Sequence, residues 1–321
     1  VLGLNSFVTV RQSDAEFYET HPSFQDMDSK SSVFISYETL EHLRDIFKNA
    51  DIVIATIFTS LSTVISLKGK DAKYVPAYFI QDYEAYFGPA GSKISNEAIR
   101  SYELAKEHDA LCFAKTKWLV DTLREKHGLS VHLITPSLDH DQYAPGHCSE
   151  GKSIQVAAMV RTTTPRRSPL MTLKVLAKLK QEYKTSVHIT IFGSSKAEVH
   201  KLQKVKTLAK VHAYDVNKEL LSSNQVSALL RNTDVFLDMS VYQAFGRSAV
   251  ECMASRCIPV VPKVGGAADL VANGAGIVVD TSDFEDIMQS LRKLLNGSKV
   301  DQRVMKLRAA AKTASMTSRR V

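Results

Sequence analysis

The segment Gln243-Ala-Phe-Gly-Arg-Ser-Ala-Val-Glu251 carries the residues of this chain that are best suited to bind a phosphorylated ligand. Its pattern predicts a loop that enters a short helix. Gly246 allows close approach of the backbone, and the first amides of a helix have no partner within it, which suits an anion. We therefore expect Phe245, Gly246 and Arg247 at the phosphate end of a ligand site.

Glu251 lies about one turn inside that predicted helix. Its carboxylate could accept two hydrogen bonds from a ribose diol, or it could simply complement the helix N-terminus, where acidic side chains are common. The strand Pro259-Val260-Val261 and the turn Gly265-Gly266 follow. Such a succession lies at the carboxyl edge of a parallel sheet, where open α/β sheets bind nucleotides and sugars. This context favours the ribose interpretation.

Strands alternate with helices along the whole chain, which predicts parallel βα units. The strands expected in the first half are 52–57, 75–80, 110–114 and 131–134, with helices at 96–108 and 117–127. The second half repeats the pattern, with strands at 154–160, 187–192, 235–239 and 276–279 and helices at 170–179, 226–230 and 284–295. We expect two facing Rossmann-like domains with a ligand in the cleft between them.

The length of 321 residues exceeds the size at which a single hydrophobic core stops growing, which favours two domains. Two prolines and a glycine interrupt the pattern at 136–146, and we expect the linker at 145–152. The boundary then falls between residues 147 and 148. The basic amphipathic stretch 301–321 could cross back onto the first domain or begin a linker to another module.

Composition is that of an ordinary soluble protein, with 44% hydrophobic and 23% charged residues. No apolar run reaches the roughly eighteen residues of a membrane span. The net charge of +7 is compatible with a polyanionic partner or an anionic membrane surface, but surface lysine is the preferred explanation. No arginine-rich aromatic ladder supports nucleic-acid binding. The chain begins at Val1 without a methionine or leader, which we interpret as an excised piece.

The cysteines give no sign of a metal site or of disulfides. Cys112, Cys148, Cys252 and Cys257 include no C-x-x-C pair, which favours free thiols in a reducing compartment. The triplet Asp139-His140-Asp141 is predicted to be a loop, because adjacent positions rarely converge on one ion. We expect no metal ion and a cytoplasmic location, with peripheral contact at the inner membrane face as a further option.

The segment from Gln243 onward resembles glycosyltransferase family 4, whose members are retaining enzymes of the GT-B fold. Glu251 matches the second glutamate of the family's Glu-x7-Glu motif, and Asp269 stands where the family usually has a glutamate. The first glutamate, which lies near the donor sugar in the family, is Gln243 here. An amide keeps the hydrogen bonding but loses the negative charge. We treat Gln243 as a candidate catalytic residue on this resemblance.

The resemblance implies further donor-binding residues. Arg161 matches the family's first diphosphate-binding basic residue, and Arg166 or Arg167 matches the second. Two fixed cations could neutralise a departing diphosphate without a metal ion, although a solvated basic loop is the alternative. The family's glycine turn, nucleobase-contacting segment and sugar-side strand end are matched by Gly193, Tyr214 and Ser240.

In the first half, Gln81-Asp82-Tyr83-Glu84 resembles a Gln-Asp-x-Glu stretch of bacterial rhamnosyltransferases within this family. Asp82 or Glu84 would then bind sugar hydroxyls or the acceptor, as candidate catalytic groups. Tyr83 and Tyr86 would pack against a pyranose face on the acceptor side. The alternative is an ordinary strand-to-loop transition whose polar residues meet solvent.

Taken over the chain, the resemblance implies a GT-B glycosyltransferase with an acceptor-side domain at 1–147 and a nucleotide-sugar domain at 148–300. It would transfer a sugar with retention, by front-face displacement, to a glycan or lipid-linked glycan in polysaccharide biosynthesis. The first choice of donor is dTDP-rhamnose. A degenerate nucleotide-sugar-binding module and a sugar-nucleotide 2-epimerase remain as alternatives. A Rossmann dehydrogenase is disfavoured, because no G-x-G-x-x-G follows a strand.

Overall fold

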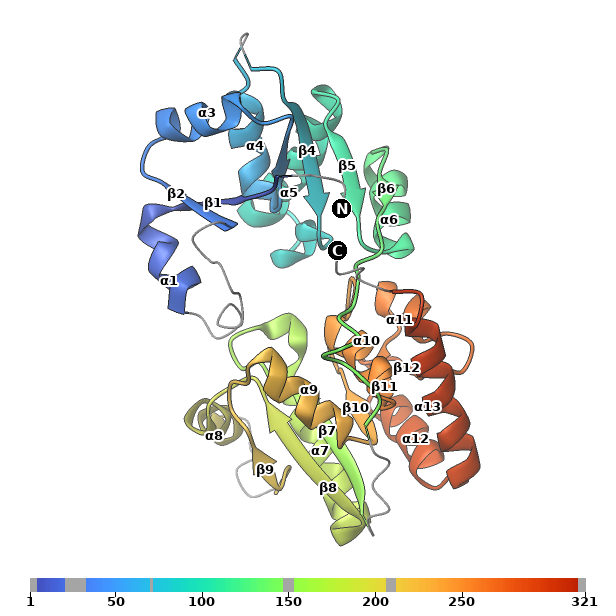
Figure 1. Ribbon diagram of the computed structural model, residues 1–321. Helices are drawn as coiled ribbons and strands as arrows, with labels where there is room; N and C mark the ends of the chain where they lie inside the picture. Colours follow the sequence, from blue (N-terminus) through green and yellow to red (C-terminus); the bar gives the residue numbers. More distant parts are fainter. Residues whose placement is uncertain (1–4, 21–32, 70–71, 147–152, 206–211, 317–321) are drawn as a thin grey trace. The chain divides into compact units, whose positions relative to one another are not determined.

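The computed structural model describes residues 5–20, 33–69, 72–146, 153–205 and 212–316. They form two compact units that divide between Thr135 and Pro136 (Figure 1). Each unit contains a parallel sheet with helices packed against it. The predicted α/β class with parallel sheets is therefore confirmed.

The first unit holds a sheet of four parallel strands whose order in space follows the chain. The strands are β3 (Ile52–Ala55), β4 (Val75–Ile80), β5 (Leu111–Ala114) and β6 (His132–Leu133). The helices are α1 (Ala15–Thr20), α3 (Leu40–Lys48), α4 (Phe58–Ser66), α5 (Lys93–Glu107) and α6 (Lys117–His127). A separate parallel pair joins β1 (Val8–Arg11) to β2 (Phe34–Tyr37).

Short polar side chains begin three helices of this unit. Thr39 begins α3, Ser92 begins α5 and Thr116 begins α6, each accepting a hydrogen bond from the amide three residues ahead. These N-caps satisfy donors that have no partner inside the helix. Gly128 ends α6 in the left-handed conformation, with φ of 60°. Local capping thus sets the helix boundaries around the sheet.

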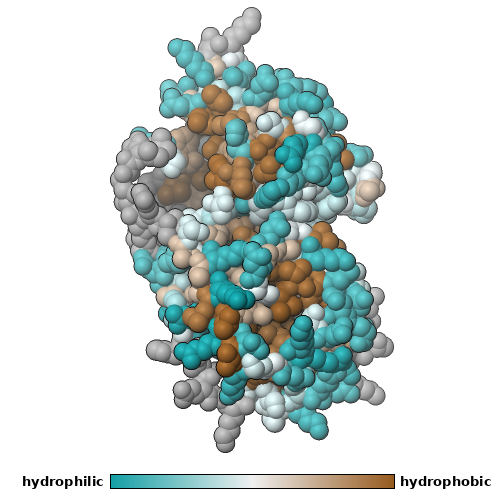
Figure 2. Space-filling model, turned by 90° about the vertical axis from the view of Figure 1, so that its right-hand side faces the viewer, coloured by the Kyte–Doolittle hydropathy of each residue, from teal (hydrophilic) through white to brown (hydrophobic). Residues whose placement is uncertain are grey.

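The two faces of the first unit's sheet differ in their surroundings. One face is buried against α4 and α5, where Tyr78 packs with Leu61 and Tyr102. The strand register places Ile52, Ile54, Val75 and Leu111 on the opposite face. Their side chains are 51%, 48%, 45% and 40% exposed. We name these four residues the bare sheet face. Apolar side chains also reach the surface of the space-filling model in Figure 2.

The second unit holds a sheet of six parallel strands in the order β12-β11-β10-β7-β8-β9. From β7, successive strands are added first on one side of the sheet (β8, β9) and then, from β10, on the other side. The position between β7 and β10 is therefore the switch point where doubly wound folds bind ligands. The strands are β7 (Ile154–Met159), β8 (Val187–Phe192), β9 (Val216–Asn217), β10 (Val235–Leu237), β11 (Ile258–Pro262) and β12 (Ile277–Val279). The helices are α7 (Pro169–Tyr183), α8 (Lys196–Val205), α9 (Ser223–Arg231), α10 (Arg247–Ala254), α11 (Gly266–Val271), α12 (Phe284–Leu295) and α13 (Lys299–Thr313).

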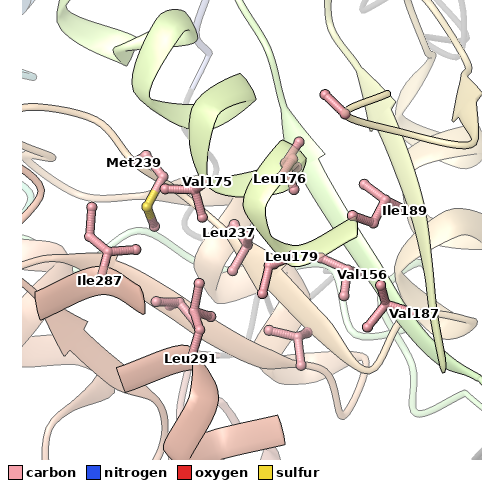
Figure 3. Packing of buried hydrophobic residues seen from close by; sticks show 14 of the residues in the cluster. Val156, Val175, Leu176, Leu179, Val187, Ile189, Leu237, Met239, Ile287 and Leu291 are labelled. Atoms are coloured by element: carbon pink, nitrogen blue, oxygen red, sulfur yellow. The ribbon is translucent and has the colours of Figure 1, made fainter. Parts of the chain in front are cut away.

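The main core of the second unit lies between its sheet and two helices. Leu176 and Leu179 of α7 pack with Val156 of β7, Leu237 of β10 and Leu291 of α12 (Figure 3). All five side chains are almost completely buried. Their burial fixes β7 beside β10, and with it the position of the loops that leave these strands.

The segment 136–146 belongs with the second unit. Leu138 and Tyr143 are buried there in one cluster with Phe245, and the amide of Leu138 donates to the carbonyl of Met316 at 2.8 Å. The expected boundary at residue 147 therefore falls inside this unit, because the apolar side chains of 136–146 need its core. Within the expected linker, residues 147–152 lie outside the described residues.

Helix α13 packs on α10 and β11 of the second unit. Its Lys306 Nζ lies 2.5 Å from Asp234 Oδ1, and the other oxygen of Asp234 accepts from the amide of Gln155 at 2.9 Å. The helix is thereby tied to the amino ends of β7 and β10. Residues 317–321 of the predicted C-terminal stretch lie outside the described residues. Among the helices of the described ranges, none is long and apolar enough to cross a membrane.

Candidate functional site

Loops from β7, β8 and β9 meet at the carboxyl edge of the second sheet. The amide of Thr162 donates to Ser194 Oγ at 3.0 Å, and the amide of Gly193 donates to the carbonyl of Glu219 at 2.7 Å. Gly193 has φ of +102°, and a Cβ there would lie 3.0 Å from the carbonyl oxygen of Val160. Glycine is therefore required at this turn, which lies next to Arg161.

Of the three arginines after β7, Arg161 precedes one turn of 3-10 helix (Pro165–Arg167), and Arg166 and Arg167 lie within that turn, just before α7. Arg161 is exposed, while Arg166 and Arg167 are half-buried. The carbonyl of Arg166 accepts from the amide of Val241 at 2.8 Å, and its guanidinium lies 5.6 Å from the centroid of the Tyr242 ring. The β7 loop is thereby joined to the β10 loop across the switch point.

Asp238 is the centre of a buried polar network just after β10. Its Oδ1 accepts from the amide of Ser240 at 3.1 Å and from the Ser240 hydroxyl. Its Oδ2 accepts from Gln243 Nε2 at 2.7 Å, and Arg167 Nη1 lies 3.6 Å from the same oxygen. The structure therefore brings three predicted site residues, Arg167, Ser240 and Gln243, onto one carboxylate.

The Gly265-Gly266 turn wraps around the backbone of Gln243. The amide of Gln243 donates to the carbonyl of Val264 at 2.9 Å, and the amide of Ala267 donates to the carbonyl of Gln243 at 3.2 Å. A Cβ on Gly265, whose φ is +111°, would lie 2.2 Å from that carbonyl oxygen. Only glycine fits there, so this turn fixes the position of Gln243.

Helix α10 begins at the carboxyl edge of the second sheet. Gly246 is its N-cap, with φ of 77° and no side chain to satisfy the first amides. Arg247 is exposed at the first helical position, whereas Phe245 is buried in the core cluster with Tyr143. The uncapped amides and Arg247 form an anion-attracting start to the helix. Phe245 contributes by packing.

Glu251 lies one turn further along α10 and is only 5% exposed. Burial raises the pKa of its carboxyl group, while the nearby Arg247 and a hydrogen bond from the Tyr143 hydroxyl act in the opposite direction. Tyr143 comes from the segment 136–146 and is itself buried. The sequence pattern gave no signal for this contact, because the two residues are far apart in the chain.

Tyr214 lies at the amino edge of the sheet, opposite the carboxyl edge that carries the other site residues. This position corrects its expected role at the nucleobase. The register pairs Val216 of β9 with Thr190 of β8, and the amide of Asp215 donates to the carbonyl of Ile189. Tyr214 is therefore beside the amino end of β8, about 17 Å from Gly193 by strand rise. Asn217, the last residue of β9, and Glu219, two residues later, are the residues that reach the carboxyl edge.

In the first unit, Glu84 is held inside the protein at 2% exposure. Its carboxylate accepts from the Tyr78 hydroxyl and from the amide of Phe58, at the start of α4, and its own amide donates to the Tyr102 hydroxyl at 2.9 Å. Burial raises the pKa of Glu84 to about 7, although both hydrogen bonds to the carboxylate lower it. With these partners, Glu84 joins α4 to the end of β4.

Asp82 and Tyr83 lie two and three residues after the end of β4, and Tyr86 comes one turn later. Asp82 is 9% exposed and accepts from the amide of Tyr83 at 2.9 Å. Tyr83 is 4% exposed and stacks on Tyr102, which corrects the expectation that its ring packs on a sugar. Tyr86 is 44% exposed, and Lys126 Nζ lies 5.1 Å from its ring centroid. Tyr86 is thus partly exposed, with Lys126 over its ring and the Tyr83 ring against it at 4.6 Å between centroids.

Comparison with known proteins agrees with this architecture. Residues 150–313 match the family model described as Glycosyl transferases group 1. No curated protein sequence matches the chain.

Solved structures share the fold at low sequence identity. Sucrose-phosphate synthase from Thermosynechococcus elongatus superposes with a TM-score of 0.72 at 12% identity, over 87% of this chain and 73% of that one. HepE from Anabaena in complex with UDP-glucose gives 0.73 at 15% identity, over 91% and 84%. A glycosyltransferase from Rickettsia africae ESF-5 gives 0.70 at 13% identity, over 98% and 95%. At such identities the likeness establishes the fold.

Proposed function

Because this chain belongs to the glycosyl transferases group 1 family and is a glycosyltransferase of the GT-B fold, we propose that its second unit binds the donor at the switch point between β7 and β10. The observation that carries the proposal is the network that joins Arg167, Asp238 and Gln243 beside the start of α10. Positive side chains, uncapped amides and a buried carboxylate lie within one cluster of loops there.

The diphosphate of the donor would bind Arg161, Arg166 and the start of α10. Arginine forms bidentate hydrogen bonds with phosphate, and a helix N-terminus adds favourable amides. As the bond to the sugar breaks, negative charge grows on the departing diphosphate. These fixed donors would stabilise that charge without a metal ion.

The sugars at either end of the diphosphate would contact the two buried acids. Glu251 would accept a hydrogen bond from the ribose or deoxyribose. Asp238 and Gln243 would lie near the transferred sugar, where the carboxylate supplies the negative charge that the amide of Gln243 lacks. A positively charged transition state at the reacting carbon would be stabilised by such a pair.

We propose dTDP-rhamnose as the donor and retention of configuration as the outcome. The rhamnose assignment is supported by the resemblance of Gln81-Asp82-Tyr83-Glu84 to bacterial rhamnosyltransferases, and retention by the resemblance to family 4. HepE, which shares the fold, was crystallised with UDP-glucose, and this supports a nucleotide-sugar donor in general. Front-face displacement, in which the departing diphosphate takes the acceptor proton, needs no protein nucleophile.

The first unit would bind the acceptor, a glycan or a lipid-linked glycan. Asp82 lies two residues after the end of β4, and Tyr86 is 44% exposed. Carboxylates accept hydrogen bonds from sugar hydroxyls, and exposed aromatic rings pack against a pyranose face. A lipid-linked acceptor would bring the protein to the inner membrane face.

A thermal-shift screen tests the donor assignment first. The purified chain is heated with dTDP, UDP, GDP and ADP and with their common sugars. A ligand at about a hundredfold over its Kd adds roughly 2.7 kcal/mol, which is readily detected. We expect the largest shift with dTDP and dTDP-rhamnose, followed by transfer of rhamnose in an activity assay. If no nucleotide shifts the transition, the proposed donor site is wrong.

A further inference from the structure

Helix α13 is held on the second unit largely through polar side chains. Lys306 Nζ lies 2.5 Å from Asp234 Oδ1, and Gln302 Nε2 donates to the carbonyl of Leu294 at 2.8 Å. Met305 adds a long apolar side chain that packs against the main core of the unit. The side of α13 that faces the protein therefore combines specific polar bonds with one large apolar contact.

The opposite side of α13 exposes apolar side chains. Val300, Val304 and Leu307 are 70%, 39% and 47% exposed, and Ala311 is exposed as well. Successive spacings of four, three and four residues place these side chains in one line along the helix. A surface helix ordinarily turns such a line toward the core. We name these four residues the outer stripe, and α13 lies at the flank of the second unit in Figure 1.

Basic side chains border the outer stripe. The helix turns by about 100° per residue, which places Arg303 on one side of the stripe and Arg308 on the other. Both are exposed, and so is Lys299 in the first turn. The acidic residue of the helix is Asp301, which accepts from the Ser298 hydroxyl at 2.7 Å. Three basic groups against one acidic group leave this surface positively charged.

An apolar line bordered by basic groups fits the surface of an anionic bilayer. Amphipathic helices of this kind lie in the membrane interface, with apolar side chains at the acyl boundary and basic groups at the anionic headgroups. The long stems of Arg303 and Arg308 allow their charges to stay at the headgroups while Val304 and Leu307 leave water. A second copy of the same face would instead bring two positively charged surfaces together, which is unfavourable.

We propose that the outer stripe of α13 docks on an anionic phospholipid membrane, with Arg303 and Arg308 at the headgroups. The inference goes beyond the proposed function, because no residue of the donor site lies on α13. It assigns the membrane contact to a surface of the second unit. The ion pair of Lys306 with Asp234 keeps the helix in place on the protein while its opposite side meets the lipid.

Sedimentation with vesicles tests the proposal on the whole chain. The purified protein is mixed with vesicles of phosphatidylcholine alone, or of equal parts phosphatidylcholine and phosphatidylglycerol, over a range of lipid concentrations. We expect binding to the anionic vesicles, and binding to the neutral vesicles that is weaker by about tenfold or more. Added salt should weaken the binding to the anionic vesicles, because it screens the exposed arginines.

Two double variants separate the apolar part of the surface from its charges. Val304→Ser with Leu307→Ser removes apolar side chains, and Arg303→Gln with Arg308→Gln removes two charges. Each variant should lower the affinity for the anionic vesicles by about tenfold or more. Unchanged affinity in both variants would overturn the proposal. If the serine variant does not fold, the glutamine variant carries the test alone, because it changes only exposed polar positions.

The bare sheet face supplies the matched control. Ile54→Ser with Val75→Ser removes two apolar side chains that are similarly exposed, at 48% and 45%. This control should bind the anionic vesicles as the wild type does. If it loses binding while the serine variant of α13 keeps it, the membrane contact lies in the first unit and the proposal is wrong. Equal binding to neutral and anionic vesicles, or binding to neither, also overturns it.

Two further measurements separate the remaining explanations. Sedimentation velocity without lipid detects self-association, and a dimer that Val304→Ser with Leu307→Ser abolishes would show that a second copy covers the stripe, which would overturn the proposal. The thermal shift with dTDP reports on the donor site. Both α13 variants should keep the wild-type shift while losing vesicle binding. If the wild type binds vesicles but shows no shift with any nucleotide, the donor site fails and the inference stands.

Discussion

Gln243 Nε2 donates a hydrogen bond to Asp238 Oδ2 at 2.7 Å, and both side chains are buried. Gln243 stands where the family 4 pattern has a glutamate, so the amide removes a negative charge from that position. Asp238 places one directly beside it. An amide is also the side chain that can donate to this carboxylate, which a second ionised carboxylate cannot do. The residue types at the two positions are therefore matched.

Restoring the glutamate should harm the protein. In Gln243→Glu, two carboxyl groups would face each other across the same contact, which raises the pKa of one of them. The free energy of unfolding should fall relative to wild type by about 1–2 kcal/mol above about pH 6, and recover as the pH falls towards about 4 and the new group is protonated. Urea unfolding across this range measures the change. The double variant Asp238→Asn with Gln243→Glu exchanges the charge across the bond, and should restore most of the stability.

Glu84 should make the stability of the first unit depend on pH. Its pKa is raised from 4.5 to about 7 in the folded protein, chiefly by burial. Between these values the folded state binds the proton more tightly than the unfolded chain, so the free energy of unfolding falls as the pH rises through this window. The loss should approach about 3 kcal/mol. Glu84→Gln should remove this dependence in urea unfolding, whereas the exposed Glu97→Gln should retain it.

Glu251→Ala should weaken binding of the nucleoside diphosphate by about 1–3 kcal/mol, because it removes the partner of a buried ligand hydroxyl. Calorimetric titration with dTDP and UDP measures the loss. Glu285→Ala, on the exposed side of α12, is the matched control and should bind as the wild type does. Unchanged affinity in a folded Glu251→Ala would exclude the proposed contact with the nucleoside sugar.

Arg161→Ala should distinguish phosphate binding from nucleoside binding. We expect an affinity loss of about tenfold for dTDP and little change for thymidine, because only the former carries the diphosphate. Competition against a labelled nucleotide measures both ligands. Arg303→Ala, which removes an exposed arginine of α13, controls for net charge. Equal losses for dTDP and thymidine would rule out a diphosphate role for Arg161.

Gly265 should tolerate no side chain. A Cβ there would lie 2.2 Å from the carbonyl oxygen of Gln243, and its φ of +111° is unfavourable for any other residue. Gly265→Ala should reduce the free energy of unfolding by about 3 kcal/mol or more. Gly69→Ala, where a Cβ meets nothing within 4 Å, should change it by less than about 1 kcal/mol. Similar losses in the two variants would contradict the packing described for the turn.

Much of the second unit could be predicted because its strands are buried on both faces and appear as continuous apolar runs. The strand expected at 187–192 is β8, and the helix expected at 284–295 is α12, with the same ends. Asp283 caps α12 by accepting from the amides of Glu285 and Asp286, a local signal that sequence can carry. The reversal of strand order between β7 and β10 then follows from the fold class.

Helix α4 was not predicted, because Phe58–Ser66 is rich in Ser, Thr and β-branched residues that favour helices weakly. Its start depends on tertiary contact, since the carboxylate of Glu84 accepts from the amide of Phe58. A partner that distant in the chain leaves no periodic signal.

The residues of the candidate site also fall into two groups, those that local sequence predicts and those that depend on contacts between distant segments. Gly193 and Gly246 could be found from local pattern, because each follows or begins a recognisable element. The pairing of Tyr143 with Glu251 and the burial of Tyr83 depend on packing between segments distant in sequence. Tyr214 was misplaced because β9 has only two residues, too few to fix a register by alternation.

The bare sheet face has a consequence for handling the protein. Ile52, Ile54, Val75 and Leu111 lie on one face of the sheet and expose apolar side chains of a kind that attracts other apolar surfaces. Sulfate and phosphate strengthen such attraction, because they are excluded from protein surfaces. The folded chain should therefore be retained on a phenyl column at moderate ammonium sulfate, and should self-associate reversibly in that salt well below its melting temperature.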